Sequence, residues 1–304
     1  MTALPSRSHR SAALAPVVVL LLALTSSLAA ACASDDGDGG AAAATSSTVP
    51  SASATVPADC PAEDTPPERL VPQVVSRVAH DPDAFTEGLV LHDGRLYEST
   101  GREGHSTVRE VDPATGRAVQ ERRLADRYFG EGLAVGPDDT LVQLTWKDGV
   151  AFVWDRPELQ AAGRHRYEGE GWGLTTLDDG TFVMSDGSDR LTERDPRDFH
   201  VVATWQVARA DGPVDELNEL EWDGTHLWAN RWQTDEIVRI DPRCHRVDGV
   251  VDASSLTAAA RLAPGAGAGG IDVLNGIAHV PGTDRFLVTG KLWPVMFDVR
   301  FVPA

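Results

Sequence analysis

Short runs of alternating apolar and polar residues, separated by turn residues, fill the chain from about residue 70 onward. Leu96-Tyr97-Glu98-Ser99 and Phe182-Val183-Met184-Ser185 are two such runs, and each follows an Asp-Gly turn, at Asp93-Gly94 and Asp179-Gly180. Asp-Gly between apolar runs is a strong hairpin signal because both residues tolerate the positive φ that tight turns need. The pattern predicts antiparallel strands, and only Ser254 to Leu262 reads as a short helix.

One motif recurs at the start of five of these hairpins. Phe129-Gly130-Glu131-Gly132-Leu133 (FGEGL) leads into an apolar strand, and Phe85-Thr86-Glu87-Gly88-Leu89 (FTEGL) is a close copy. The other copies are Gly171 to Leu174, Asn218 to Glu221 and Leu274 to Ile277. The markers Gly88, Gly132, Gly173, Leu220 and Gly276 are spaced roughly 41 to 56 residues apart, which is typical of propellers built from small repeated sheets.

The fifth repeat and the start of the repeat region complete this interpretation. The fifth repeat ends with a third strand, Val295 to Phe301, and no fourth strand follows it. Val74 to Val78 precedes the first repeat and has no other sheet to join, so its pairing with the last repeat would remove an open sheet edge. The sequence therefore predicts an all-β fold, a five-bladed β-propeller whose ring is closed by the N-terminal strand, over residues 69–304.

The N-terminal region predicts export. Arg7 and Arg10 precede an apolar run and then small residues up to Cys32, as in a secretory signal peptide over residues 1–32. Cys32 after three alanines resembles a lipobox, which predicts a lipid anchor and a secreted or cell-envelope lipoprotein; ordinary cleavage nearby and an uncleaved anchor helix are the alternatives. Residues 33–68 contain almost no large apolar side chains, which is typical of a disordered tether.

Cysteine usage and charge refine the picture. Cys60 and Cys244 remain once Cys32 is set aside, and an even pair outside the cytoplasm favours a disulfide, although two separate thiols are the alternative. The net charge of −19 argues against a nucleic-acid partner, because such proteins carry basic surfaces. The 9 histidines show no paired zinc-ligand spacing.

An ordered set of motifs from residue 73 to residue 302 resembles the plant and bacterial type of glutaminyl-peptide cyclotransferase. The motifs are FTEGL, YESTG (Tyr97 to Gly101), YFGEGL (Tyr128 to Leu133), GWGL (Gly171 to Leu174), LNELEW (Leu217 to Trp222), WANRWQTD (Trp228 to Asp235), IDVLNGIA (Ile271 to Ala278) and TGKLWP (Thr289 to Pro294). The resemblance implies an enzyme that converts N-terminal glutaminyl residues of peptides to pyroglutamyl, with release of ammonia.

The resemblance assigns the chemistry to Glu131. The substrate's own α-amine attacks its γ-carboxamide, so the protein must mainly move protons, and the family's acid/base glutamate falls on this position. Glu87 lies at the same place one repeat earlier, where some plant members carry Gln, which implies substrate binding. Solvated surface carboxylates beside a glycine turn are the alternative interpretation.

The other expected site residues would bind the substrate. Trp146, Trp172 and Trp232 match family pocket positions together with Phe85 and Phe129, although most propeller tryptophans fill space between blades, as we expect for Trp154, Trp205 and Trp222. Asn218 and Lys291 match LNELE and TGKLW and could stabilise the developing oxyanion, while a solvated side chain is the alternative for Lys291.

The remaining expectations concern cofactors, partners and rival functions. Catalysis should need no metal, although a structural calcium in the central channel would leave no sequence signal. The protein should be a monomer that meets the membrane only through its lipid. A non-catalytic secreted propeller that binds a peptide or sugar is the alternative function, and a calcium-dependent lactonase-like hydrolase is a third.

Overall fold

The alternating runs form strands at the expected places. The structure, a computed structural model, describes residues 57–58, 60–267 and 269–304, all within the compact unit Ala54–Ala304. The first sheet contains β2 (Thr86–His92), β3 (Arg95–Thr100), β4 (Thr107–Val111) and β5 (Ala118–Arg123). The second contains β6 (Gly130–Gly136), β7 (Thr140–Thr145), β8 (Val150–Asp155) and β9 (Gln160–Arg166). The third contains β10 (Leu174–Thr176), β11 (Phe182–Ser185), β12 (Arg190–Arg194) and β13 (Val201–Gln206).

A larger sheet includes both ends of the repeat region. Its strands lie in the order β16 (Leu217–Trp222), β17 (Leu227–Arg231), β18 (Glu236–Asp241), β19 (Arg246–Asp252), β1 (Glu68–Ala79), β22 (Val295–Pro303), β21 (Arg285–Gly290) and β20 (Leu274–His279). A short hairpin, β14 (Ala208–Arg209) with β15 (Gly212–Pro213), joins the edge of β19.

The N-terminal strand pairs with the C-terminal strand, as the sequence predicted. β1 runs antiparallel to β22, with Val78 opposite Met296. It begins earlier than expected, and Glu68 to Leu70 also pair in parallel with β19, where Leu70 lies opposite Val251. Because this extension covers the free edge of β19, the two groups of strands predicted as separate sheets are continuous.

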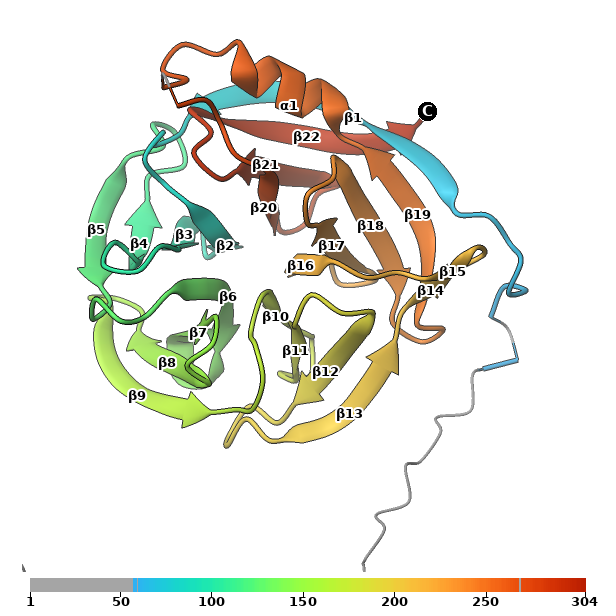
Figure 1. Ribbon diagram of the computed structural model, residues 1–304, viewed down its shortest axis with the longest axis horizontal. Helices are drawn as coiled ribbons and strands as arrows, with labels where there is room; N and C mark the ends of the chain where they lie inside the picture. The colour runs from blue at the N-terminus through green and yellow to red at the C-terminus, as the bar shows by residue number, and fades with distance from the viewer. Residues whose placement is uncertain (1–56, 59, 268) are drawn as a thin grey trace, which may run out of the picture. The chain divides into compact units, whose positions relative to one another are not determined.

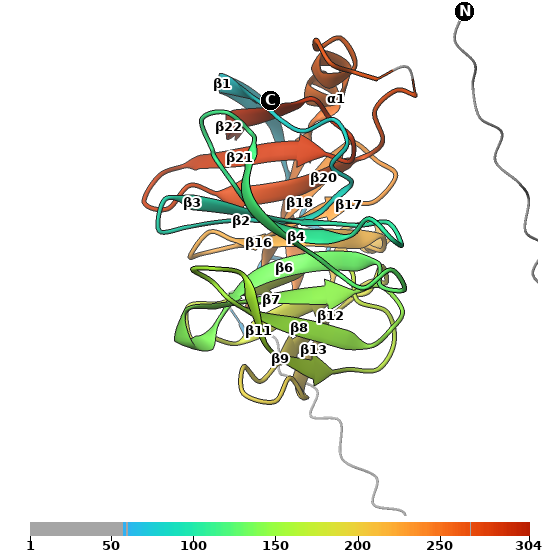
Figure 2. The same ribbon diagram turned by 90° about the vertical axis from the view of Figure 1, so that its left-hand side faces the viewer.

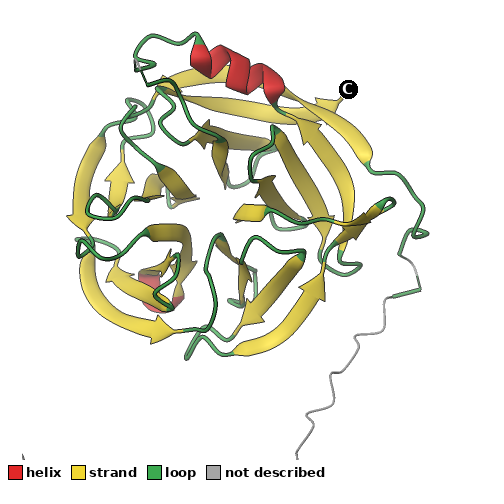
Figure 3. Cartoon of the chain, viewed as in Figure 1, coloured by secondary structure: helices red, strands yellow, loops and turns green. Residues whose placement is uncertain are grey.

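The sheets are arranged around a common centre, with β2, β6, β10, β16 and β20 innermost (Figure 1). The helix α1 (Ser254–Arg261) lies on the outside beside β1 and β22, and the side view shows it at the same edge (Figure 2). Apart from α1 and a 3-10 turn at Pro137–Asp139, the described part of the chain consists of strands and loops (Figure 3). The protein is therefore an all-β protein.

Apolar side chains fill the spaces between successive inner strands and their sheets. Leu133 of β6, 1% exposed, packs with Tyr97 and Val108 of the first sheet, and its truncation to Ala would cost about 2–5 kcal/mol. Trp154 and Trp205 are buried in such clusters and Trp222 packs against one, which confirms the space-filling use predicted for all three.

A disulfide joins Cys60 and Cys244, with a Cα–Cα distance of 5.7 Å. Cys244 lies in the turn between β18 and β19, so the bond fastens the segment before β1 to the outer part of the large sheet. The predicted pairing is therefore present.

The predicted signal peptide, Cys32 and most of the predicted tether lie outside the described residues. Within the described ranges, no helix has the length and apolar character needed to cross a bilayer.

Candidate active site

Four of the five inner strands, β2, β6, β16 and β20, have a register shift at their motif residues. In β6 the pairing moves from Gly130↔Thr145 to Leu133↔Gln143, so that two residues of β6 stand against one of β7. β16 shows the same step between Leu217 and Leu220, and β20 between Leu274 and Ile277. A bulge of this kind redirects side chains, and such bulges are common beside active sites. Glu87, Glu131, Asn218 and Asn275 lie at these register shifts, whereas Trp172 lies just before β10, whose pairing with β11 is regular.

In four of the five repeats the next residue along the chain is a glycine, because the inner strands approach one another closely there. A Cβ on Gly132 would lie 2.5 Å from the amide nitrogen of Leu174, and one on Gly173 would lie 2.0 Å from the carbonyl oxygen of Asn218. In β16 the equivalent residue is Glu219. The sequence analysis took Leu220 as the marker of this repeat. That marker was wrong by one residue, because Glu219 occupies the position of the glycine in the other repeats.

Glu219 fills the centre between the strands. It is fully buried, and its two carboxyl oxygens accept hydrogen bonds from the backbone N–H of Leu89 on β2 (3.1 Å) and of Ile277 on β20 (3.0 Å). Burial raises its pKa well above the ordinary value, and the nearby charge of Glu221 adds to this. Glu219 thus joins three inner strands by satisfying buried backbone donors.

One cavity, of about 270 Å³, collects the predicted site residues. It is lined by Phe85, Glu87, Phe129, Glu131, Trp146, Trp172, Asn218, Trp232, Asp272 and Lys291. The structure thus brings all nine predicted catalytic and substrate-binding residues together. The sequence prediction did not include the tenth, Asp272, although it lies within the IDVLNGIA motif.

Glu87 and Lys291 form a buried ion pair in this cavity. The Lys291 Nζ lies 2.8 Å from Glu87 Oε2, and the two side chains are 7% and 1% exposed. Asn275 Nδ2 also donates to Glu87 Oε2, at 3.3 Å. The other oxygen, Oε1, is buried and has no N–H donor among the described residues. Lys291 is therefore not the solvated lysine of the alternative interpretation.

Glu131 lies next to this pair and has a different environment. It is 6% exposed, and it shares a hydrogen bond with Glu87 while no N–H group in the described ranges donates to it. Burial raises its pKa well above the ordinary value, and the charge of Glu87 raises it further. Burial also raises the pKa of Glu87, although Lys291 opposes this shift. The arrangement therefore favours a proton on Glu131, which donates it in the hydrogen bond to Glu87.

Aromatic rings form the walls of the cavity. The ring centroids of Trp172 and Trp232 are 5.4 Å apart in an edge-to-face contact, and those of Phe129 and Trp146 are 5.7 Å apart. All four are half-buried, so each presents part of its surface to the cavity. Such walls bury a small ligand and exclude water from the charged groups.

Glu170 holds two of the tryptophans from outside the cavity. Its Oε2 accepts hydrogen bonds from the indole Nε1–H of Trp146 (2.7 Å) and of Trp172 (3.0 Å). Lys147 lies 3.5 Å from the same carboxylate and 3.6 Å from the Trp146 ring centroid. Burial raises the pKa of Glu170, but these partners outweigh it, so the net shift is downward and the group is ionised. The sequence showed no signal for this role.

Asn218 brings an unused polar atom to the cavity. It is 2% exposed, and its Oδ1 is buried without a hydrogen-bond donor in the part of the chain that the structure describes. A buried amide oxygen without a donor is costly. The N–H groups of a bound substrate would remove this cost.

Glu98, the neighbouring buried carboxylate, shows the opposite electrostatics. Arg109 donates to its Oε2 at 2.9 Å, and Thr86 donates to Oε1 at 2.6 Å, while His80 Nε2 lies 3.0 Å from Oε1. Although burial raises the pKa of Glu98, Arg109 and His80 lower it by more, and the group stays ionised. Glu98 is thus held as an anion by its partners, whereas burial and the charge of Glu87 favour the protonated form of Glu131.

Two groups of potential metal ligands occur among the described residues, and neither lines this cavity. They are His92–Asp93–Asp139 and Asp195–Asp198–His200, both largely exposed. Between the inner strands, both carboxyl oxygens of Glu219 already accept hydrogen bonds from backbone N–H groups. A metal-free reaction and a channel calcium both stay untested predictions.

A protonated carboxyl, an ion pair and aromatic walls in one small cavity define an enzyme site for proton transfer on a small, largely neutral group. The sequence model of the glutamine cyclotransferase family matches residues 42–301. The glutaminyl-peptide cyclotransferase of Arabidopsis thaliana is 39% identical over 235 residues, which cover 76% of this chain and 72% of that protein. The crystal structure of the Myxococcus xanthus glutaminyl cyclase is similar with a TM-score of 0.71 and 39% identity, over 78% of this chain and 99% of that one. The chain belongs to the glutamine cyclotransferase family.

Proposed function

We propose that the protein converts N-terminal glutaminyl residues of peptides to pyroglutamyl residues and releases ammonia. The observation that carries this proposal is the buried, protonated Glu131 beside the Glu87–Lys291 ion pair, at the end of an aromatic cavity. A scaffold that only binds ligands has no use for a carboxyl group kept neutral by burial, which argues against the alternative of a non-catalytic binding propeller.

The cavity suits a glutaminyl side chain. About 270 Å³ is small for a ligand pocket, so it accepts one short side chain and leaves the rest of the peptide outside. The methylene groups would pack against the cavity-facing surfaces of Trp172 and Trp232, and the carboxamide would meet the polar end of the cavity. Asn218 Oδ1, which lacks a donor, would accept from the carboxamide nitrogen.

The first step joins two parts of the same residue. The lone pair of the α-amine nitrogen forms a bond to the γ-carbonyl carbon, and the π pair of the carbonyl moves to its oxygen. The amine reacts in its neutral form, which an α-amino group with a pKa of about 8 supplies near neutral pH. Lys291 uses one N–H for Glu87 and has two further donors for the oxyanion.

The second step expels ammonia. Glu131 gives its proton to the carboxamide nitrogen, and the C–N bond pair leaves with that nitrogen as the carbonyl re-forms. The ring nitrogen, which carries an extra proton after attack, returns one to Glu131. The carboxyl group is thus regenerated, and the sum of the steps releases one ammonia without hydrolysis.

Glu87 assists in two ways. Its charge holds Lys291 in the cavity, and the same charge raises the pKa of Glu131. Glu87 is therefore a binding and tuning residue rather than the group that moves protons.

The proposal also includes the number of propeller blades and the location of the protein in the cell envelope. We interpret the ten-stranded sheet as two blades joined through β1, which with the other three sheets makes a five-bladed propeller. The five apolar clusters of the described residues, one between each pair of neighbouring sheets in this arrangement, support that count. An exported, lipid-anchored monomer with its catalytic domain at residues 69–304 is the corresponding whole-chain arrangement.

The function is tested with a purified protein and a Gln-initiated peptide. The expected product lacks one ammonia and has a blocked N-terminus, and an otherwise identical Asn-initiated peptide serves as the control because its amine cannot close a five-membered ring. Turnover should survive dialysis against a metal chelator. No mass loss would refute the cyclase activity, and activity restored only by zinc would refute the metal-free mechanism.

A further inference from the structure

A second and larger cavity lies at the other end of the inner strands. Its volume is about 560 Å³, within the usual range for small-molecule sites. The catalytic cavity is lined from the starts of β2 and β6, at Glu87 and Glu131, whereas this one is lined from their ends, at His92 and Val135. Glu219 fills the space between the strands and lines neither cavity. We call this second cavity the distal cavity.

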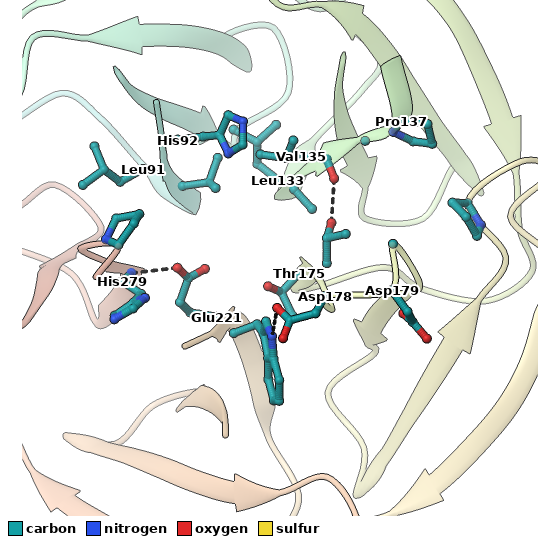
Figure 4. Close-up of a pocket in the computed structure, with 18 residues that line it drawn as sticks. Leu91, His92, Leu133, Val135, Pro137, Thr175, Asp178, Asp179, Glu221 and His279 are labelled. Atoms are coloured by element: carbon teal, nitrogen blue, oxygen red, sulfur yellow. Dashed lines mark hydrogen bonds between the residues drawn. The ribbon is translucent and has the colours of Figure 1, made fainter. Parts of the chain in front are cut away.

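Glu221 projects into the distal cavity (Figure 4). It is 7% exposed, and its Oε1 accepts a hydrogen bond of 2.7 Å from the backbone N–H of His279. No side-chain donor among the described residues reaches either oxygen, and the backbone N–H of Trp222 is the other donor near this carboxyl group. A carboxyl group at least nine-tenths buried therefore lines the distal cavity without a cationic partner.

The other deeply buried glutamates near the centre, apart from Glu131 in the catalytic cavity, have a cationic partner or a hydrogen-bond donor for each oxygen. Glu98 has Arg109 and His80, and Glu87 has Lys291. Glu219 has a backbone N–H for each oxygen. Glu221 has no cationic partner among the described residues, and it lines a cavity large enough for a ligand.

The lining of the distal cavity selects for positive charge. Its described lining contains no lysine or arginine, and besides Glu221 its ionisable residues are Asp178, Asp179, His92 and His279. Asp178 Oδ1 accepts a hydrogen bond from the indole N–H of Trp222 at 2.9 Å. His279 Nε2 lies 2.8 Å from the carbonyl oxygen of Thr283, so that nitrogen donates to Thr283.

The remaining lining favours an organic cation over a metal ion. A calcium ion takes six to eight oxygen ligands, usually from several carboxylates. In the described ranges, Glu221 belongs to no group of three potential ligating side chains. The walls around it are instead apolar, from Leu91, Leu133 and Val135 among others. An alkyl chain would contact these walls while its charged end meets Glu221.

We propose that the distal cavity binds a primary alkylammonium group, with Glu221 as its counter-ion. The group can belong to a small free amine or to a lysine side chain of a peptide, since both present the same chemistry. This inference does not depend on the proposed cyclase function, because the cavity shares no lining residue with the catalytic one.

Binding of n-butylammonium chloride to the purified protein tests the site, with n-butanol as the uncharged probe of the same length. Calorimetry at pH 9 should show binding of the amine and at least tenfold weaker binding of the alcohol. Glu221→Gln should weaken amine binding at least tenfold, since Gln keeps an acceptor for His279 but removes the charge. Glu158→Gln is the matched control, because Glu158 is exposed, lies outside the cavity and should leave affinity unchanged.

The pH dependence gives a second readout. Burial raises the pKa of Glu221 to about 8, with Asp223 adding to the shift and the backbone N–H groups of His279 and Trp222 opposing it. Affinity should therefore rise about tenfold from pH 7 to pH 9, while the amine itself stays charged. Glu221→Gln should lose this rise.

Several results would overturn the proposal. These are no amine binding at about 50 mM, equal binding of amine and alcohol, or equal binding by wild type and Glu221→Gln. Competition by N-acetyl-lysinamide would support a peptide-borne ligand, and its failure beside butylammonium binding would support a free amine. Circular dichroism checks that Glu221→Gln folds, and its turnover of a Gln-initiated peptide should equal that of wild type.

Discussion

Replacing Glu87 by Gln separates the two roles that the structure gives to the carboxyl pair. The variant keeps an oxygen that can accept from Asn275, but it removes the negative charge that lies 2.8 Å from Lys291. The loss of that charge, together with the unpaired Lys291 cation, should lower the pKa of Glu131, because both changes favour its ionised form. The proton carrier remains in place, with an altered pKa.

We expect Glu87→Gln to act mainly on the free energy of unfolding and Glu131→Gln mainly on the catalytic rate. Breaking a buried ion pair on one side costs about 3–5 kcal/mol, so Glu87→Gln should destabilise the protein even though the resemblance to plant enzymes with Gln predicts a mild effect. Glu131→Gln removes the group that moves protons, and a loss of about 10²–10⁴-fold in rate corresponds to about 2.7–5.4 kcal/mol of transition-state stabilisation. Glu87→Gln should keep much more of the activity than this.

The assay is the pH dependence of ammonia release for wild type and Glu87→Gln. Activity rises with pH as the substrate amine loses its proton, and it falls again when Glu131 loses its own. The descending limb should therefore lie at lower pH in Glu87→Gln than in wild type, while the ascending limb stays fixed by the substrate.

Three outcomes would refute this reasoning. An unmoved or upward-shifted descending limb in Glu87→Gln would show that the charge of Glu87 does not tune Glu131. Comparable rates in Glu131→Gln and wild type would show that Glu131 carries no proton. An inactive Glu87→Gln beside an active Glu131→Gln would mean that the two roles are reversed.

Three further predictions concern parts of the molecule around the site. Glu170→Ala should raise KM for a Gln-initiated peptide about fivefold to tenfold, as expected for one or two lost hydrogen bonds to the tryptophans, and Glu170→Gln should raise it less; an unchanged KM in both would contradict the positioning role. The pKa of Glu221, about 8 in the folded state, exceeds its unfolded value, so the stability it contributes is complete below about pH 4.5 and is lost as pH rises to 8. Urea unfolding measures the free energy of unfolding at each pH between about 4.5 and 8. This free energy should fall with pH less steeply in Glu221→Gln than in wild type, by about 1.4 kcal/mol per pH unit, and equal slopes would refute that pKa. Deleting Val74–Val78 should severely lower the melting temperature because β22 loses its partner, whereas wild-type melting would exclude a role for this pairing in stability.

The sequence predicts most of this architecture because the turn chemistry is local. Asp-Gly turns and alternating runs set each hairpin, and the strand pairing of the first three sheets follows chain order. The extension of β1 to β19 could not be predicted, since Glu68 to Leu70 fall in a polar, proline-rich stretch and gain order only from the edge they cover.

Some of the site residues could likewise be predicted from the sequence, and others could not. Motif residues such as Glu131 and Lys291 could be named from the sequence because each lies at a recognisable place in a repeat. Glu219 was missed because it replaces a glycine, and its role depends on N–H groups from two distant strands. Glu170 was missed because nothing local distinguishes a carboxylate that binds two indoles from a solvated one.

In the proposed reaction, Glu131 moves the proton that releases ammonia during ring closure. A Gln-initiated peptide with ¹⁵N in its side-chain amide tests this role when it is incubated with wild type and with Glu131→Gln whose folding and peptide binding have been verified. We expect ¹⁵N-ammonia and an unlabelled pyroglutamyl peptide from wild type, and a rate at least about 100-fold lower from Glu131→Gln. Label retained in the product, a hydrolysed Glu-initiated peptide, or wild-type release by Glu131→Gln would contradict it.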